Sequence, residues 1–409
     1  MSKEKRRVPK LRFPGFTEDW EQRKADYIFK SVTEKGYPEL PVLSASQELG
    51  MVYRNQNGID IQHDKKNESS YKRVSPGQFV IHLRSFQGGF AYSEVEGITS
   101  PAYTVMSFKN SSEQYGLFWK YVFKSETFIK RLETITYGIR DGRNISFSDF
   151  KSLMLQYPSF LEQELIGDLI AIIESGITLH QRKLNNLKLK KKALLQKLFP
   201  KNGERYPELR FPGFTDAWEQ RKFGELFILK SGVAFKLSEY TKTGIPIING
   251  ESIKAGKISL EKINYLPNEY QYKYQECLLF PGDIVLGLNR PIIDGTLKIS
   301  RIPADIKKSL LYQRAGKIIF KVNMDENFTY QLLSKEVLTF TKKEAVGSDQ
   351  PFITTTKLNK WDLYFPVKDK ERRNIGSLFN NIDNIITLHQ RKLDHLQLQK
   401  KALLQQMFV

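Results

Sequence analysis

The chain has 409 residues and a formal net charge of +19 at pH 7, a balance that favours a polyanionic partner, nucleic acid first. At about 100 to 200 residues per domain this length allows two or three domains, and a hydrophobic content of 40% is enough to form cores. No run approaches the roughly 18 apolar residues of a membrane span, and the single cysteine, Cys277, excludes an intrachain disulfide.

The N-terminus, MSKEKRRVPK, is basic but lacks the apolar stretch of a signal peptide. Together with the cysteine count this favours a globular protein of the reducing cytoplasm with no membrane contact. We expect Cys277 to be a small buried hydrophobic residue.

The first element in chain order is an aromatic segment, residues 9–24, with the sequence PKLRFPGFTEDWEQRK. It recurs at residues 207–222 as PELRFPGFTDAWEQRK, an offset of 198 with 13 of 16 positions identical. Phe-Pro-Gly-Phe followed by Trp suits a tight turn whose aromatic side chains anchor the segment on a neighbouring element. Six aromatic residues should serve this structural role: Phe13, Phe16, Trp20, Phe211, Phe214 and Trp218.

Two bodies of unlike sequence follow the aromatic segments. Residues 25–158 mix short apolar runs such as QFVIHL and AYTVMSF with Gly, Pro, Asn and Ser, and residues 223–366 follow the same plan. Pro76-Gly77 and Pro281-Gly282 stand at matching places in the two bodies. This pattern predicts short strands joined by turns, with a helical stretch near the end of each body, and hence two similar α+β domains.

Each body leads into a long helix. Residues 177–199 read ITLHQRKLNNLKLKKKALLQKLF and return at residues 386–408 as ITLHQRKLDHLQLQKKALLQQMF, with 17 of 23 positions identical at an offset of 209. Heptad steps through residues 166–198 and, in the same register, through residues 375–407 each give ten core positions, eight of them apolar. Neither stripe can be buried alone, so two helices of about 40 residues should pack on each other over roughly 60 Å.

The heptad pattern defines a helix seam with one histidine in each helix, His180 and His389, which we interpret as setting register or contacting a partner. The seam residues are Ile173, Ile177, His180, Leu184, Leu187, Leu194, Ile382, Ile386, His389, Leu393, Leu396 and Leu403. Residues 179–203 also carry eight Lys or Arg and no acid, a run that could be solvated, lie along DNA or meet an acidic partner subunit.

The expected domain organisation follows from these repeats. It comprises a first body with its aromatic segment (1–158), a first spacer helix (159–200), a second body with its aromatic segment (201–366) and a second spacer helix (367–409).

The sequence contains no recognisable catalytic signature. GESIKAGK, residues 250–257, has five rather than four residues between its glycines, and Ile258 stands where a P-loop needs Ser or Thr. There is no GxGxxG motif and no Asn or Asp followed by Pro-Pro and an aromatic residue, by which amino-methyltransferases hold an exocyclic amine. The five histidines lack metal-ligand spacing to one another or to Cys277. We expect no catalysis, metal or cofactor on this chain.

Basic and polar residues displayed on loops are the remaining candidates for function. Arg can contact guanine edges in a bidentate manner, Asn and Gln can do so with adenine, and glycines let the backbone approach a phosphate. Ten loop residues are therefore our candidates for DNA binding: Arg84, Gln87, Arg140, Arg143, Asn144, Asn289, Arg290, Gln313, Arg314 and Gln350.

With two LRFPGF…W segments, two ITLHQRKL…KKALLQ helices and two unlike bodies, the chain resembles the DNA specificity subunit of a type I restriction-modification system. The resemblance covers the entire chain. It implies that each body is a target recognition domain reading one half of a split DNA site, and that the helices pair antiparallel as a spacer. The chain departs from the family at the loop before Ile145, which reads Gly-Ile-Arg-Asp-Gly-Arg-Asn where the second body has Gly-Ser-x-Gln.

The resemblance also implies partners. In that family the helices dock adenine methyltransferase subunits, two of them on this reading, and a separate translocating endonuclease subunit joins the complex. S-adenosylmethionine then belongs to the methyltransferase, and ATP and Mg²⁺ belong to the endonuclease.

Two alternatives remain at this point. A stand-alone two-domain DNA-binding regulator or architectural protein would show the same charge and repeats, and an enzyme with an unfamiliar site would lack the motifs sought above.

Overall fold

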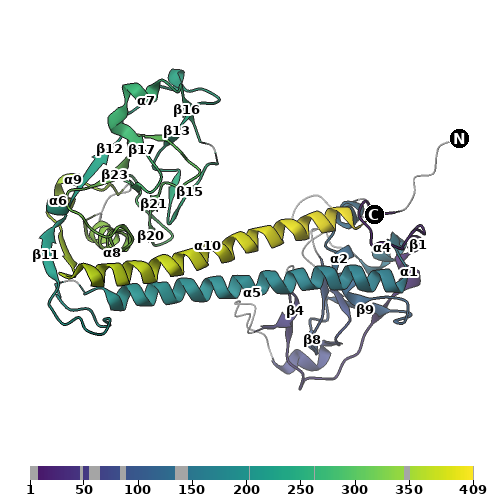
Figure 1. Ribbon diagram of the computed structural model, residues 1–409. Coiled ribbons are helices and arrows are strands. Elements are labelled where there is room, and N and C mark those ends of the chain that lie inside the picture. The colour runs from purple at the N-terminus through teal and green to yellow at the C-terminus, as the bar shows by residue number, and fades with distance from the viewer. Residues whose placement is uncertain are drawn as a thin grey trace. The chain divides into compact units, whose positions relative to one another are not determined.

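The computed structural model describes residues 8–46, 49–54, 65–82, 89–133, 146–201, 203–261, 263–344 and 351–408. The chain forms two compact units: unit 1 comprises Met1–Lys183 and His389–Val409, and unit 2 comprises Leu184–Leu388. The boundary crosses both long helices. Each unit therefore contains one body, the beginning of one long helix and the end of the other (Figure 1).

The body in unit 1 is a mixture of short strands and helices. Its main sheet has four antiparallel strands in the order β2-β9-β6-β7, and β3-β4, β5-β8 and β1-β10 form smaller antiparallel pairs. The elements are β1 (Glu21–Lys24), α1 (Ala25–Ile28), β2 (Phe29–Val32), β3 (Leu43–Ser46), β4 (Gly50–Tyr53), the 3-10 helix η2 (Lys65–Ser70), β5 (Lys72–Val74), β6 (Phe79–Ile81), β7 (Phe90–Tyr92), β8 (Gly97–Thr99), β9 (Thr104–Phe108), α2 (Gly116–Val122), α3 (Glu126–Glu133), α4 (Phe147–Ser152) and β10 (Met154–Tyr157).

The body in unit 2 repeats this plan with additional strands. Its main sheet is β12-β23-β18-β21, and a second four-stranded sheet, β16-β13-β22-β17, includes the parallel pair β13 and β22. The elements are β11 (Glu219–Lys222), α6 (Phe223–Leu226), β12 (Phe227–Ser231), η3 (Leu237–Glu239), β13 (Ile245–Ile248), β14 (Ile253–Lys254), β15 (Lys257–Ile258), β16 (Tyr265–Leu266), α7 (Tyr270–Lys273), η4 (Gln275–Cys277), β17 (Leu278–Leu279), β18 (Ile284–Gly287), β19 (Ile292–Ile293), β20 (Thr296–Leu297), β21 (Ile299–Arg301), β22 (Ser309–Leu311), β23 (Ala315–Phe320), α8 (Glu326–Glu344), α9 (Thr355–Leu358) and β24 (Asp362–Phe365).

Both main sheets are covered on two faces, and the alternation of side chains along one strand shows how. In β6, Phe79 and Ile81 lie in the cluster that contains the helices, whereas Val80 lies in a second cluster on the opposite face. In β18, Leu286 and Val285 divide in the same way between two clusters. An apolar strand buried on both faces explains why these runs show no polar alternation in the sequence.

The two long helices are α5 (Phe160–Leu198) and α10 (Asp369–Gln406). In unit 1, Lys400 Nζ lies 2.6 Å from Glu174 Oε1, and His180 Nδ1 lies 2.8 Å from His389 Nδ1, so residue numbers fall along α10 as they rise along α5. The helices therefore pack antiparallel. The α+β fold predicted from the sequence, with two similar mixed domains, an antiparallel pair of long helices and an internal repeat, is confirmed.

The end of each long helix enters the core of a body. Phe408, just after α10, packs on Phe118 of α2 with ring centroids 5.7 Å apart, and Figure 1 shows the C-terminal end of α10 reaching this body. Phe199, just after α5, stacks on Phe328 of α8 at 5.6 Å. Repeated positions thus perform the same packing in both units.

The aromatic segments act as anchors in the described structure. Trp20 and Trp218 are 1% and 0% exposed, and Phe13 and Phe211 are half-buried against the same cores. Cys277 is also buried, and burial raises the pKa of its thiol.

Candidate nucleic-acid interface

The loops of the second body that were predicted to bind DNA come together in unit 2. Leu288 N donates a hydrogen bond of 2.9 Å to Arg314 O, which joins the segment after β18 to the turn between β22 and β23. Arg290 N donates to Pro351 O at 2.9 Å, and Ile353 N donates to Leu288 O at 2.9 Å. Three segments distant in sequence therefore form one surface; Gln350, immediately before Pro351, lies outside the described residues.

Both arginines on this surface have a left-handed backbone, with φ of +44° at Arg290 and +67° at Arg314. For a residue with a Cβ this conformation costs about 1 to 3 kcal/mol, and such residues cluster at functional sites. Their side chains are exposed and make no hydrogen bond or ion pair within the described chain. The fold thus holds at the surface two guanidinium groups that have no partner among the described residues, where an anionic ligand can reach them.

The neutral candidates on this surface differ in their contacts. Gln313 Nε2 donates to Tyr312 Oη at 3.3 Å, so its amide is partly committed within the protein. The backbone oxygen of Asn289 accepts from Lys298 Nζ at 3.4 Å. Lys298, which lies between β20 and β21 and is buried beside this surface, was not predicted from the sequence because a lysine is ordinarily a solvated residue.

The candidates in the first body cannot be placed in the same way. Arg84 and Gln87 fall between β6 and β7, and Arg140, Arg143 and Asn144 fall between α3 and α4, outside the described residues. Their roles remain predictions from the sequence.

The seam residues of the long helices are all buried or half-buried, and Leu184 and Leu393 are 1% and 3% exposed. Each lysine at a heptad position forms an ion pair with the facing helix. Lys191 pairs with Asp383 at 2.6 Å in unit 2, just as Lys400 pairs with Glu174 in unit 1.

Glu174 of α5 is a carboxyl group whose charged form is stabilised by neighbouring lysines. Burial opposes its charge, but Lys124, Lys400 and Lys120 outweigh burial and lower its pKa to about 2. Its carboxylate also accepts a hydrogen bond of 2.9 Å from Tyr121 Oη in α2, so it ties the helix pair to the body of unit 1.

A buried ion pair repeated in both units was missed from the sequence. Arg12 of the first aromatic segment makes a two-pronged contact with Glu162 of α5, at 2.7 and 2.8 Å. Arg210 makes the same contact with Glu371 of α10, at 2.7 and 2.9 Å. The arginine that both LRFPGF motifs contain was the signal in the sequence that could have indicated this ion pair.

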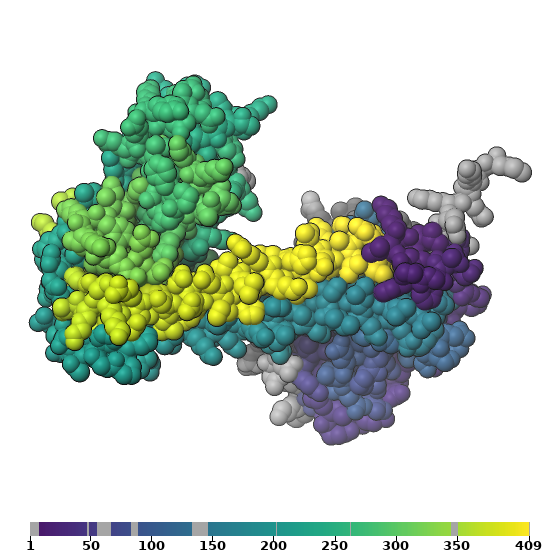
Figure 2. Space-filling model, viewed as in Figure 1, coloured from purple at the N-terminus to yellow at the C-terminus, as the bar shows by residue number. Residues whose placement is uncertain are grey.

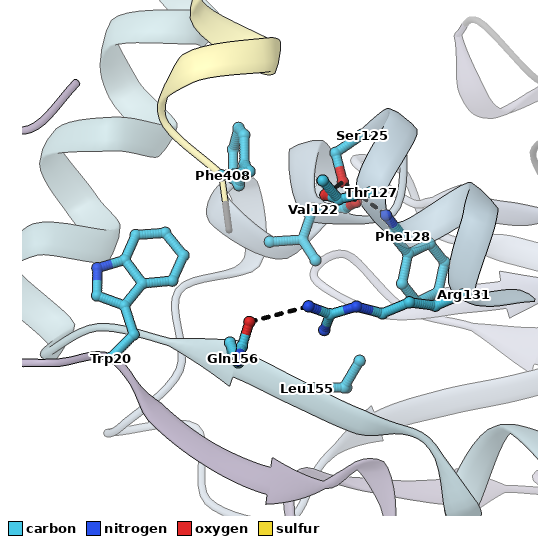
Figure 3. A pocket seen from close by; sticks show the side chains of 9 residues that line it. All are labelled: Trp20, Val122, Ser125, Thr127, Phe128, Arg131, Leu155, Gln156 and Phe408. Carbon is cyan, nitrogen blue, oxygen red and sulfur yellow. Dashed lines mark hydrogen bonds between the residues drawn. The ribbon is translucent and has the colours of Figure 1, made fainter. Parts of the chain in front are cut away.

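The cavity drawn in Figure 3 is too small for a substrate. The cavity in Figure 3 lies where Phe408 meets Trp20 and Leu155, and its volume of about 10 Å³ has room for about one water molecule. Arg131 donates a hydrogen bond of 2.9 Å to Gln156 at its edge. Among the described residues, no group of His, Cys, Asp and Glu side chains could hold a metal ion, and none of the helices could span a membrane.

The fold and this surface define a class: a two-domain protein with paired spacer helices and basic loops. Comparison with known proteins agrees. A model of the type I restriction modification DNA specificity domain matches residues 215–398. The chain is 30% identical over 263 residues to the type I restriction enzyme MjaVIII specificity subunit of Methanocaldococcus jannaschii, covering 62% of this chain and 61% of that protein.

Two further similarities have different weight. The type I restriction enzyme EcoAI specificity subunit of Escherichia coli is 29% identical over 102 residues, 25% of this chain and 17% of that one. The crystal structure of a type I restriction-modification system S subunit from M. genitalium matches with a TM-score of 0.65, 16% identity, and coverage of 98% of this chain and 99% of that chain. At 16% identity the latter shows the fold alone.

The chain is thus similar to type I restriction-modification specificity subunits, and residues 215–398 carry the match to the DNA specificity domain. It spans 61% of the length of the M. jannaschii relative and less of the E. coli one.

Proposed function

We propose that this chain is the DNA-reading subunit of a type I restriction-modification complex, and that it is not itself catalytic. Each body reads one half of a bipartite, asymmetric target, with the first body at residues 1–158 and the second at 201–366. The observation that carries this proposal is the contrast between closely repeated scaffold segments and unlike bodies. Two different domains on one scaffold suit a target with two different halves.

The proposed contacts divide by chemistry. Lys and Arg on phosphates supply affinity, and a few Arg, Asn and Gln side chains on base edges supply sequence choice. The exposed guanidinium groups of Arg290 and Arg314, which form no ion pair with the described residues, support this role in the second body. In the first body, Arg84, Arg140 and Arg143 are the corresponding proposals.

The partners we propose are double-stranded DNA, two adenine methyltransferase subunits on the helices, and restriction subunits that translocate DNA. The helices supply matched apolar side chains: Leu189 on α5 and Leu398 on α10 are 65% and 67% exposed at equivalent repeat positions. Figure 2 shows α10, in yellow, open on the face turned to the viewer. In this proposal S-adenosylmethionine is bound by the methyltransferase, ATP and Mg²⁺ by the restriction subunit, and the complex works in the cytoplasm.

The decisive experiment exchanges one body. Residues 25–158 are replaced by the first body of another family member, the chain is combined with its methyltransferase partner, and methylated adenines are mapped across a genome. We expect one half of the methylated motif to change and the other half to stay. Replacement of residues 223–366 is the matched control and should alter the opposite half.

The same reconstitution separates this proposal from a stand-alone regulator. The purified chain should transfer no methyl group to DNA until the partner is added. Methylation by the chain alone, or a failure of any methyltransferase encoded beside it to bind, would contradict the proposal.

A further inference from the structure

Lys298 lies between β20 and β21 and is buried, with 6% of its surface exposed. Its ammonium group has one polar contact in the described chain, the hydrogen bond of 3.4 Å to Asn289 O. An ammonium has three protons to donate and is seldom buried without an opposite charge. Two of its donors are therefore left without an acceptor from the described protein.

A lysine on β23 shows the usual arrangement. Lys317, on β23 of the same sheet, contacts Asp283 Oδ2 at 2.6 Å and Leu278 O at 3.3 Å. Lys317 has a carboxylate as its hydrogen-bond partner, whereas Lys298 has no such partner among the described residues.

The surroundings of Lys298 add positive charge. Burial lowers the pKa of Lys298, and the nearby cations Lys254 and Arg290 lower it further, against a single opposing carboxylate, Glu251. Lys254 belongs to the β14–β15 hairpin, which is fixed on β21 by a hydrogen bond of 2.8 Å from Gly256 N to Ile299 O. The cations are therefore held together by the sheet despite their mutual repulsion.

Glycine at position 287 makes room for the lysine stem. A Cβ on Gly287 would lie 2.8 Å from Lys298 Cδ and 3.0 Å from Lys298 Cβ. Gly287 N also donates to Lys298 O at 2.9 Å, so the two residues face each other across the end of β18 and β21. The stem passes over Gly287, and the ammonium reaches the corner formed by Asn289 and Arg290.

We propose that Lys298, with Lys254 and Arg290, forms a subsite for one phosphate group, namely a phosphodiester of the DNA strand read by the second body. This inference rests on the proposed function. The buried ammonium directs two donors to the phosphate oxygens, and Arg290 contacts the same group from the exposed side. The DNA supplies the missing counter-charge, so folding tolerates an unpaired cation that binding then neutralises.

The test uses the full chain and a duplex of mixed sequence, with affinity measured over a series of salt concentrations. Lys298→Met keeps the stem and removes the charge. We expect at least about tenfold weaker binding at low salt and a salt slope smaller by about one unit. The melting temperature should rise by about 2 °C or more, because the buried charge is gone. Lys298→Gln provides a second variant with the same expected loss of slope.

Lys317→Met is the matched control, since it removes the same charge from the same sheet but leaves Asp283 without its partner. It should lower the melting temperature and leave the salt slope unchanged. An unchanged slope in both Lys298 variants, with wild-type DNA binding intact, would overturn the subsite and leave the proposed function standing.

Inorganic phosphate distinguishes the two sources of the anion. If the wild-type chain fails to bind duplex DNA but phosphate raises its melting temperature, and this rise is lost in Lys298→Met, the ligand is a small phosphate and both the DNA assignment and the proposed function are wrong. If Lys298→Met melts lower than wild type and binds DNA equally well, the lysine is structural and the subsite is overturned.

Discussion

At the end of β6 and β7 in unit 1, His82 faces Gly89, whereas at the end of β18 and β21 in unit 2, Gly287 faces Lys298. The backbone contact is the same in both places, His82 N to Gly89 O at 3.0 Å and Gly287 N to Lys298 O at 2.9 Å. The large side chain, His82, directly follows β6 in unit 1, whereas in unit 2 the large side chain, Lys298, directly precedes β21. Two sheets with one register therefore present different chemistry at the same point.

The segments that hold each sheet on its helix show the opposite behaviour. Arg12 with Glu162 and Arg210 with Glu371 make the same two-pronged contact in the two units. The contrast indicates that the repeat preserves the attachment of each body and leaves its surface free to diverge.

The largest effect is expected from breaking the Arg–Glu contact. Arg210→Met leaves the Glu371 carboxylate, 1% exposed, without its partner, and should lower the free energy of unfolding by about 3 to 5 kcal/mol. Arg12→Met should cost a similar amount, because Glu162 is 0% exposed. Urea unfolding of the full chain measures both.

The double variant Arg210→Met with Glu371→Leu is the control. It removes both charges and should recover most of the lost stability. A double variant as unstable as the single one would mean that packing of the arginine stem, rather than a stranded charge, causes the loss.

A smaller effect is expected where the helices touch the bodies through glycine. A Cβ at Gly376 would collide with Asp325 Oδ1 and lie 2.7 Å from Phe328 N, and one at Gly167 would lie 2.9 Å from Phe118 N. Alanine at either position should therefore destabilise by about 1 to 3 kcal/mol. Gly176→Ala is the matched control in α5: its Cβ would meet Leu396 at an ordinary 3.4 Å, so it should stabilise by about 0.5 to 1 kcal/mol.

Thermal or urea unfolding of the three alanine variants decides this prediction by sign. Stabilisation by all three would show that the bodies move aside for the added methyl groups, and that glycine is not required at positions 167 and 376.

The sequence predicted the helices and the strand-rich bodies better than the surface of the second body, for a physical reason. The heptad repeat and the apolar runs of β6 and β18 are local signals, so the helices, the seam and the strand-rich bodies could be inferred. The meeting of Leu288 with Arg314 and of Arg290 with Pro351 depends on pairing between distant segments, which no local period encodes. Lys298 was missed because only the fold reveals its burial.

The next prediction exchanges the side chains at the end of the sheet in unit 2. Gly287→His combined with Lys298→Gly reproduces the arrangement of His82 and Gly89, and should change the free energy of unfolding by less than about 1.5 kcal/mol. Gly287→His alone should cost more, because the ring would overlap the Lys298 stem. A double-mutant cycle measures the coupling between the two positions; coupling near zero would show that the positions are not equivalent to those of unit 1.

The smallest effect is expected where identical residues of the two repeats meet, His180 and His389. Partial burial, then His389, Lys183 and Lys392, lower the pKa of His180, so the folded state favours the neutral ring. This contribution to stability is complete above the unfolded pKa near 6.5 and is lost as the pH falls through that value towards the lower pKa of the folded state.

His180→Asn removes the titrating group, so its urea midpoint should fall less between pH 7.5 and 5.5 than that of the wild type. His395→Gln, an exposed histidine on the same repeat of α10, should keep the wild-type dependence. Equal pH dependence in the wild type and in His180→Asn would show that the two rings tolerate protonation together, and the close nitrogen pair would then have no role in the pH response of the helix pair.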